Sequence, residues 1–166
     1  MTQQEIKTIA LVGGGVIGGG WATRCLANGL NVVVTDPRPE SRDYVERMID
    51  EAWPILEEAD LIAESGGQLS FVDNIEAAVA QADFVQENVP EREDLKIAIH
   101  QEISENVRAD VVIASSSSGL LPSRLQSQCK HPERLLIGHP FAPVYLLPLV
   151  EVVGSEQTSS DAVSRA

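Results

Sequence analysis

Cysteine, basic residues and long apolar runs are all scarce in this chain of 166 residues. Its two cysteines, Cys25 and Cys129, form no C-x-x-C pair and, with only three histidines, give no metal-ligand spacing. No run of about 18 apolar residues occurs, which argues against a transmembrane helix. Only 12 lysines and arginines stand against 25 aspartates and glutamates, for a formal net charge of −13. The chain therefore lacks the basic stripe with which proteins bind nucleic acid or an anionic membrane.

The start of the chain carries no targeting signal that we can identify. Residues 1–6 have neither the basic nor the apolar region of a signal peptide. Both cysteines are interpreted as reduced thiols, as is usual in the cytoplasm. Hydrophobic residues make up 43% of the chain, which is enough for a core. We expect one cytoplasmic globular domain of ordinary size.

The first 36 residues predict a strand, a turn, a helix and a second strand. Residues 7–12 are mostly apolar and run into six glycines between positions 13 and 20. Helix-like spacing continues to Ala27, and Asn28-Gly29 supplies a helix stop. The run NVVVT at 31–35 is β-branched and unbroken, as in a parallel strand buried on both faces. This is a βαβ unit.

The same alternation continues along the chain. A polar helix is predicted over 41–64, with Pro54 breaking or kinking it. Further strands are predicted at 68–72, 83–87, 111–114, 134–139 and 149–153, and helices at 75–81, 92–107 and from 158 onward. Alternating strands and helices predict an α/β fold of the Rossmann type, with a doubly wound, mostly parallel sheet.

The glycine turn matches the pattern G-x-G-x-x-G of dinucleotide-binding folds. Its residues are Gly13, Gly14, Gly15, Val16, Ile17 and Gly18. The first glycine permits a tight turn, the second lets the backbone approach a diphosphate, and the third allows close helix–strand packing. The following helix presents free N–H groups to the phosphates. A tight turn without a ligand is the alternative interpretation.

An acidic residue stands where such folds bind the adenosine ribose. Asp36 closes the second strand 18 residues after Gly18. Its carboxylate can accept a hydrogen bond from the ribose 2′-hydroxyl and would repel a 2′-phosphate, which favours NAD over NADP. Arg38 leaves NADP open, because an arginine nearby can bind that phosphate.

A histidine and a glutamate at the end of the chain form a candidate acid–base pair. His139 ends a predicted strand, and Glu151 lies 12 residues later in the next one. Three prolines stiffen the connection, and a carboxylate in a buried strand needs a partner. Such a pair suits removal of a hydroxyl proton near neutral pH. A structural histidine is the alternative. His100 and His131 are interpreted as solvated.

Four segments together resemble a known family. GGGVIGGGW (13–21), DFVQENVPEREDLK (83–96), ASSSSGLLPS (114–123) and HPERLLIGHPFAPVYLLPLVEVV (131–153) are similar to the NAD-binding domain of the 3-hydroxyacyl-CoA dehydrogenase family. The resemblance implies an NAD-dependent oxidoreductase that oxidises the 3-hydroxyl of a small hydroxy acid. It also implies that 1–153 form the NAD-binding domain and that 154–166 begin a linker helix. The helical C-terminal domain of the family, through which its members dimerise, is absent from this sequence.

The resemblance assigns roles residue by residue. It makes His139 the catalytic base, Glu151 its orienting carboxylate, and Ser118 a ligand of substrate and nicotinamide. Glu91 and Lys96 would line the cofactor site. The sequence departs from the family at one position, because Ala142 stands where the family usually has asparagine.

The segment 40–64 bears on the substrate. It holds nine acids, two arginines and no lysine, a charge that would repel the phosphates of CoA and attract a small cation. We therefore expect L-carnitine as the substrate. Aromatic faces bind trimethylammonium groups such as that of L-carnitine, and Phe141, Tyr145 or Trp53 are the candidates for this contact. The alternatives are a 3-hydroxyacyl-CoA dehydrogenase and a nucleotide-binding module without turnover, like a lens crystallin.

Overall fold

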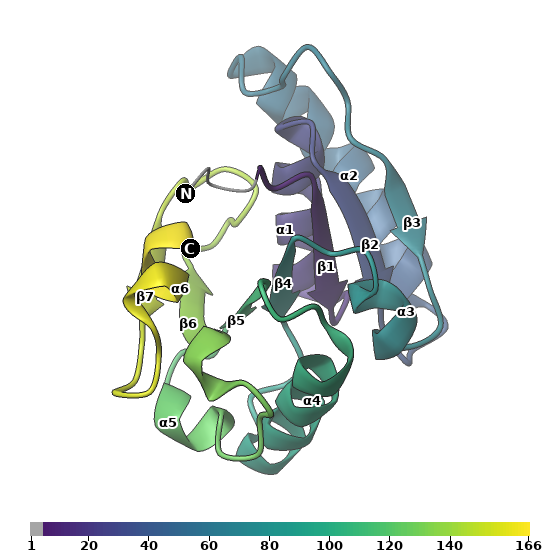
Figure 1. Cartoon of the computed structure of the whole chain (residues 1–166). Coiled ribbons are helices and arrows are strands. Elements are labelled where there is room, and N and C mark those ends of the chain that lie inside the picture. The colour runs from purple at the N-terminus through teal and green to yellow at the C-terminus, as the bar shows by residue number, and fades with distance from the viewer. Residues whose placement is uncertain (1–4) are drawn as a thin grey trace.

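The computed structural model describes residues 5–166 as a seven-stranded sheet covered by helices (Figure 1). Residues 1–4, which belong to the segment 1–6 and to the domain 1–153 discussed above, lie outside the described residues. The strands are β1 (Thr8–Val12), β2 (Asn31–Thr35), β3 (Leu69–Phe71), β4 (Phe84–Glu87), β5 (Val112–Ser115), β6 (Leu135–Pro140) and β7 (Val150–Val153). The helices are α1 (Val16–Ala27), α2 (Ser41–Glu58), α3 (Ile75–Val79), α4 (Glu93–Asn106), α5 (Pro122–Leu125), the 3₁₀ turn η1 (Pro132–Arg134) and α6 (Ser160–Arg165).

The sheet is parallel except at one edge, which confirms the predicted fold. Its strand order is β3-β2-β1-β4-β5-β6-β7, and only the β6–β7 pair is antiparallel. Alternate residues of β1 enter two different cores, Leu11 on the face covered by α1 and α2, Ala10 and Val12 on the face covered by α3 and α4. The middle of the sheet is thus buried on both faces, which explains its unbroken apolar strands.

The carboxyl ends of the parallel strands form one row, because their register is regular. Val12 of β1 pairs with Thr35 of β2 on one side and with Glu87 of β4 on the other. Glu87 in turn pairs with Ser115 of β5. The strand order reverses between β1 and β4, and doubly wound sheets bind ligands in the crevice at such a point.

Several helices differ from the sequence-based prediction. Helix α2 continues through Pro54 and ends at Glu58, so the helix is shorter than 41–64 and is not broken at the proline. Pro54 lies on the exposed side of α2, where water can satisfy the carbonyl that a proline leaves without a donor. The sequence did not predict α5 or η1, each of which has four residues or fewer. None of the helices in residues 5–166 is long and apolar enough to cross a membrane.

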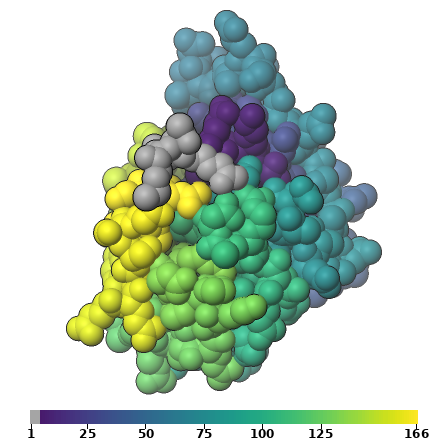
Figure 2. All heavy atoms as spheres, in the orientation of Figure 1, coloured from purple at the N-terminus to yellow at the C-terminus, as the bar shows by residue number. Residues whose placement is uncertain are grey.

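The C-terminal elements pack on the same sheet. Ser159 caps α6 by accepting a hydrogen bond from the Ala162 amide, as the sequence predicted for a helix start. Ala162 is buried against Val112, Ala114 and Leu136 of β5 and β6. In the space-filling view this yellow segment lies directly against green segments from the second half of the chain (Figure 2). The prediction that 149–153 form a buried strand is wrong, because β7 is an exposed edge strand.

Candidate active site

The glycine turn joins β1 to α1 with three glycines in three different environments. Gly13 has a φ of 103°, and a Cβ there would lie 2.8 Å from the Asn88 carbonyl. A Cβ on Gly18 would lie 1.9 Å from the Gly13 oxygen. At Gly15 the nearest atom is Arg38 Nη2, 3.7 Å from the Cβ position. Gly13 and Gly18 are therefore required by packing, whereas Gly15 keeps open a space in front of the turn.

The first turn of α1 is free to bind an anion. No side chain caps it, and it contains no acidic residue. Its first two residues, Val16 and Ile17, line a pocket rather than packing under a loop. Backbone N–H groups in such a position attract a phosphate, aided by the helix dipole.

Asp36 follows β2 beside the glycine turn and is saturated with donors. One carboxylate oxygen accepts the Gly14 amide and Arg38 Nη2, both at 2.8 Å. The other accepts the Arg38 amide and Nε, both at 2.9 Å. Burial alone would raise the pKa of Asp36, but the hydrogen bonds from Arg38 and Gly14 lower it below its ordinary value. Asp36 is thus an ionised acceptor whose side chain is only 6% exposed.

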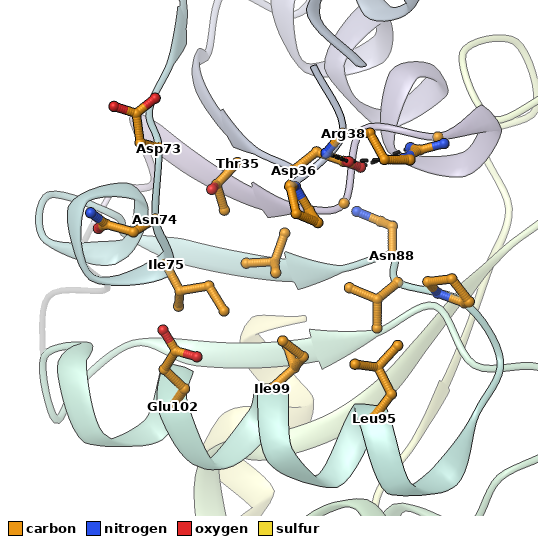
Figure 3. A pocket seen from close by; sticks show the side chains of 16 residues that line it. Thr35, Asp36, Arg38, Asp73, Asn74, Ile75, Asn88, Leu95, Ile99 and Glu102 are labelled. Atoms are coloured by element: carbon orange, nitrogen blue, oxygen red, sulfur yellow. Dashed lines mark hydrogen bonds and ion pairs between the residues drawn. The ribbon is translucent and has the colours of Figure 1, made fainter. Parts of the chain in front are cut away.

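A cleft of about 630 Å³ opens beside Asp36 (Figure 3). Leu95, Ile99 and Glu102 project into it from α4, and Ile75 faces them from the start of α3. Its walls are largely apolar, and Asp36 with its arginine lies at one end. A flat aromatic base fits such walls, with a ribose at the carboxylate.

Two smaller pockets extend this cleft across the sheet. A pocket of about 270 Å³ at the start of α1 shares Asn88 with the first cleft and is also lined by Lys96 and Ser118. A pocket of about 190 Å³ shares Ser118 and is lined by His139 and Glu151. One path therefore leads from Asp36 past the glycine turn to His139. Sequence reasoning missed Asn88, although its place directly after a strand of the row could have indicated it.

Below this path lies a fully buried ionic cluster centred on Glu87. Lys96 Nζ and the Val89 amide lie 2.6 Å from one carboxylate oxygen. His100 Nε2, at 3.1 Å, and Ser115 Oγ, at 2.5 Å, lie at the other. Burial alone would raise the pKa of Glu87, but contacts with His100 and Lys96 lower it below its ordinary value. The interpretation of His100 as solvated is wrong, since its side chain is entirely buried.

Glu91 connects this cluster to the serine loop after β5. Its Oε2 lies 3.5 Å from Lys96 Nζ. Its Oε1 accepts hydrogen bonds from Ser117 Oγ at 2.5 Å and from the Ser118 and Gly119 amides at 3.1 and 3.2 Å. The pKa of Glu91 is lowered, because these donors outweigh the effect of its partial burial. An ionised Glu91 thus holds the loop that carries Ser118.

His139 stands between two polar partners at the end of β6. Its Nδ1 lies 2.8 Å from Glu151 Oε2, and its Nε2 lies 3.2 Å from Ser118 Oγ. An ionised carboxylate only accepts hydrogen bonds, so Nδ1 carries the proton and Nε2 of a neutral ring is free to accept one. The imidazole is 26% exposed and the Glu151 side chain 59%, so both remain accessible from solution.

Comparison with known proteins identifies the family. The family model described as "3-hydroxyacyl-CoA dehydrogenase, NAD binding domain" matches residues 8–166. The chain belongs to this family. The chain spans about half the length of the curated relatives it matches. L-carnitine dehydrogenase of Pseudomonas aeruginosa is 52% identical over 163 residues, 98% of this chain and 51% of that protein. L-carnitine dehydrogenase of Oceanobacillus iheyensis is 48% identical over 162 residues, 97% of this chain and 53% of that protein.

Solved structures of other dehydrogenases show the same fold. A 5-formyl-3-hydroxy-2-methylpyridine 4-carboxylic acid 5-dehydrogenase, an NAD⁺-dependent dismutase, has a TM-score of 0.89 at 32% identity and covers 96% of this chain and 52% of that one. An (S)-3-hydroxybutyryl-CoA dehydrogenase from Ralstonia eutropha has a TM-score of 0.86 at 26% identity, covering 96% of this chain and 58% of that one.

NAD is the cofactor of this family domain, and the residues present fit it. Gly15 leaves room for a diphosphate in front of an uncapped helix, and Asp36 offers a carboxylate where a ribose would lie. Only the Arg38 side chain stands in the way, and it is half exposed. The structure thus gathers the residues predicted for the cofactor around one path. Lys96 is buried in the wall of this path and is not exposed to solvent.

Only some of the aromatic and acidic residues expected near the substrate lie close to His139. Phe141 is close, with its ring centroid 5.7 Å from that of His139. Trp53 instead lines a separate groove with Glu46 and Asp50 of α2. No residue of 40–64 lines the pockets that contain Lys96, Ser118 or His139. The acidic helix therefore acts on a substrate at most through its long-range field.

Proposed function

We propose that this chain supplies the NAD-binding domain and the catalytic pair of an L-carnitine dehydrogenase. The observation that carries the proposal is the row Ser118–His139–Glu151 at the far end of the nucleotide path. The identity of about half of all residues with L-carnitine dehydrogenases supports the choice of substrate. The reaction would convert L-carnitine and NAD⁺ to 3-dehydrocarnitine, NADH and a proton.

In this proposal each residue of the row has one task. Ser118 Oγ donates a hydrogen bond to the substrate oxygen, and His139 Nε2 accepts the proton of the 3-hydroxyl as the C3 carbonyl forms. Glu151 keeps the proton of the ring on Nδ1 and stabilises the imidazolium that results. When bound at this path, NAD⁺ would supply the acceptor for the hydride that leaves C3. Lys96 and Glu91 hold the wall and the serine loop beside it.

Two features concern substrate recognition. The Phe141 ring beside His139 offers an aromatic face to a trimethylammonium group. Ala142, three residues after His139, is exposed and has no side-chain amide with which to hold a substrate or nicotinamide oxygen. We therefore expect this chain to bind one of these groups less tightly than relatives with asparagine there.

Binding and turnover test the proposal separately. NADH titration followed by fluorescence tests the nucleotide path in the chain alone. Turnover is then measured with L-carnitine and with 3-hydroxybutyryl-CoA, in this chain alone and in this chain joined to the second half of the Pseudomonas aeruginosa relative. NADH binding with turnover of L-carnitine supports the proposal, and preference for the CoA ester refutes the substrate. NADH binding without any turnover, with either substrate and in both proteins, indicates a nucleotide-binding module.

Location and assembly are part of the same proposal. Membership of the family supports a cytoplasmic enzyme that is a homodimer as a whole protein. Light scattering on the joined protein tests the dimer, and cell fractionation tests the location.

A further inference from the structure

We propose that His100 is a positioning residue for the nucleotide path, acting through Glu87 on Lys96. The inference rests on the proposed cofactor path and concerns a residue outside it. His100 itself lines none of the three pockets along that path. It reaches the path only through the buried carboxylate below.

Helix geometry brings His100 and Lys96 to the same carboxylate. They lie four residues apart on α4, so their side chains share one face of the helix. Both are buried, with exposures of 0% and 1%, and both reach Glu87 at the end of β4. The other buried residues of α4 are Ile103, which belongs to the apolar core, and Ser104. A histidine and a lysine there serve a polar partner.

Glu87 has an acceptor position for each of its partners. Oε1 holds Lys96 and the Val89 amide, and Oε2 holds Ser115 with His100 3.1 Å away. Neither ring nitrogen of His100 makes a hydrogen bond of ordinary geometry with the described residues, and the polar contact of the ring is the approach of Nε2 to Glu87 Oε2 at 3.1 Å. The ring thus fixes the second oxygen and thereby the orientation in which the first oxygen meets Lys96.

The orientation of Lys96 matters because its ammonium has two carboxylates within reach. Nζ lies 2.6 Å from Glu87 and 3.5 Å from Glu91, and the residue lines the pocket at the start of α1. Without His100, Oε2 keeps only Ser115, and Glu87 is free to turn. Lys96 then moves toward Glu91, which also disturbs the loop that Glu91 holds. The positive charge in the wall of the pocket is no longer where a nucleotide would meet it.

The test is NADH affinity in variants that keep or remove the Nε2 contact. Glutamine places an amide nitrogen near the position of Nε2, and asparagine near that of Nδ1. We expect His100→Gln to bind NADH within threefold of the original chain. His100→Asn and His100→Leu should bind about tenfold more weakly, as expected for loss of one polar contact with a charged group. Ile103→Val, a buried change on the same helix without contact to Glu87, is the control and should leave the affinity unchanged.

Two outcomes would overturn the proposal. One is equal affinity of the Gln and Asn variants, which decides the matter even if the Leu variant does not fold. The other is a Leu variant with an intact circular dichroism spectrum that binds NADH as tightly as the original chain. A further check uses the Glu87→Gln background, in which His100→Leu should have no additional effect on NADH affinity. Failure of the original chain to bind NADH would instead refute the nucleotide path, and this proposal with it.

Discussion

His139 and Glu151 stand directly opposite each other in the antiparallel register of β6 and β7, with Nδ1 and Oε2 2.8 Å apart. The other strand pairs described in the sheet are parallel, so the contact between His139 and Glu151 depends on the antiparallel strand β7. A one-residue slip of β7 would turn Glu151 to the opposite face of the sheet and replace it with an apolar neighbour. In the proposed reaction, the edge strand therefore has a role that its exposed position does not suggest.

Replacing Glu151 with glutamine should impair turnover and spare the cofactor. A glutamine amide can donate to Nδ1, which would favour the ring form that carries its proton on Nε2 and cannot act as a base. We expect turnover of L-carnitine to fall by about 10²- to 10⁴-fold, with NADH affinity within twofold. Steady-state kinetics and NADH titration measure the two quantities. Glu156→Gln removes the same charge from an exposed position nearby and should change neither. Unchanged turnover in Glu151→Gln would contradict the assigned pairing.

The glycines of the turn should separate folding from binding. A Cβ at Gly18 meets the Gly13 oxygen at 1.9 Å, so Gly18→Ala should destabilise the fold. Gly15→Ala meets nothing closer than 3.7 Å and should leave the urea midpoint almost unchanged. Its methyl group would stand in front of the turn and lower NADH affinity at least about tenfold, because the backbone no longer approaches the diphosphate. Gly66→Ala, in open surroundings, is the control for both. Normal NADH binding by Gly15→Ala would refute the position of the diphosphate.

Sequence reasoning succeeded where a local pattern determines the geometry. The spacing of Gly13, Gly15 and Gly18 and the acid at Asp36 fix a turn, a helix start and a carboxylate beside the turn within 24 residues. The strands β1, β2 and β5 also showed themselves as apolar runs, because the middle of the sheet is covered on both faces.

The buried cluster was beyond such reasoning. Glu87, Lys96 and Ser115 come from three elements and meet only because β4 and β5 pair in one register. A histidine such as His100 within a mixed helix is compatible with either solvent or core, and only the fold decides between them. Glu151 was correctly predicted to pair with His139. The reason given, burial of its strand, was wrong, because that strand is exposed.

The ionic cluster should make stability sensitive to acid. The folded-state pKa of Glu87 lies below its ordinary value of 4.5, so the folded chain binds fewer protons than the unfolded chain in the range between them. The free energy of unfolding is therefore highest above about pH 4.5 and falls as the pH drops toward the folded-state pKa. Asp36 and Asp83, whose pKa values are also lowered, add to the same trend. Urea unfolding between pH 7 and pH 3 measures it.

Variants of Glu87 and Lys96 test whether Glu87 causes this loss of stability in acid. Glu87→Gln leaves the Lys96 ammonium buried without its closest partner and should cost about 3–5 kcal/mol of stability at pH 7. Glu87→Gln with Lys96→Met removes both charges and should recover part of the loss, with a flatter pH dependence than the original chain. If the double variant shows the same acid sensitivity as the original chain, Glu87 is not its source.

Arg38 should compete with NAD for Asp36. All four acceptor positions of the carboxylate are taken, two by backbone amides and two by the guanidinium. A ribose hydroxyl can therefore bind only if the guanidinium leaves. Because the guanidinium is half exposed, the strength of the pair is modest, and Arg38→Leu should tighten NADH binding by about two- to fivefold. The ratio of the NADH affinity of Arg38→Leu to that of the original chain should shrink as added salt weakens the Asp36–Arg38 ion pair. Arg42→Leu, which removes the same charge from a side chain stacked on Phe71, controls for the long-range field. Weaker NADH binding by Arg38→Leu alone would mean that this guanidinium contacts the nucleotide directly instead of competing with it.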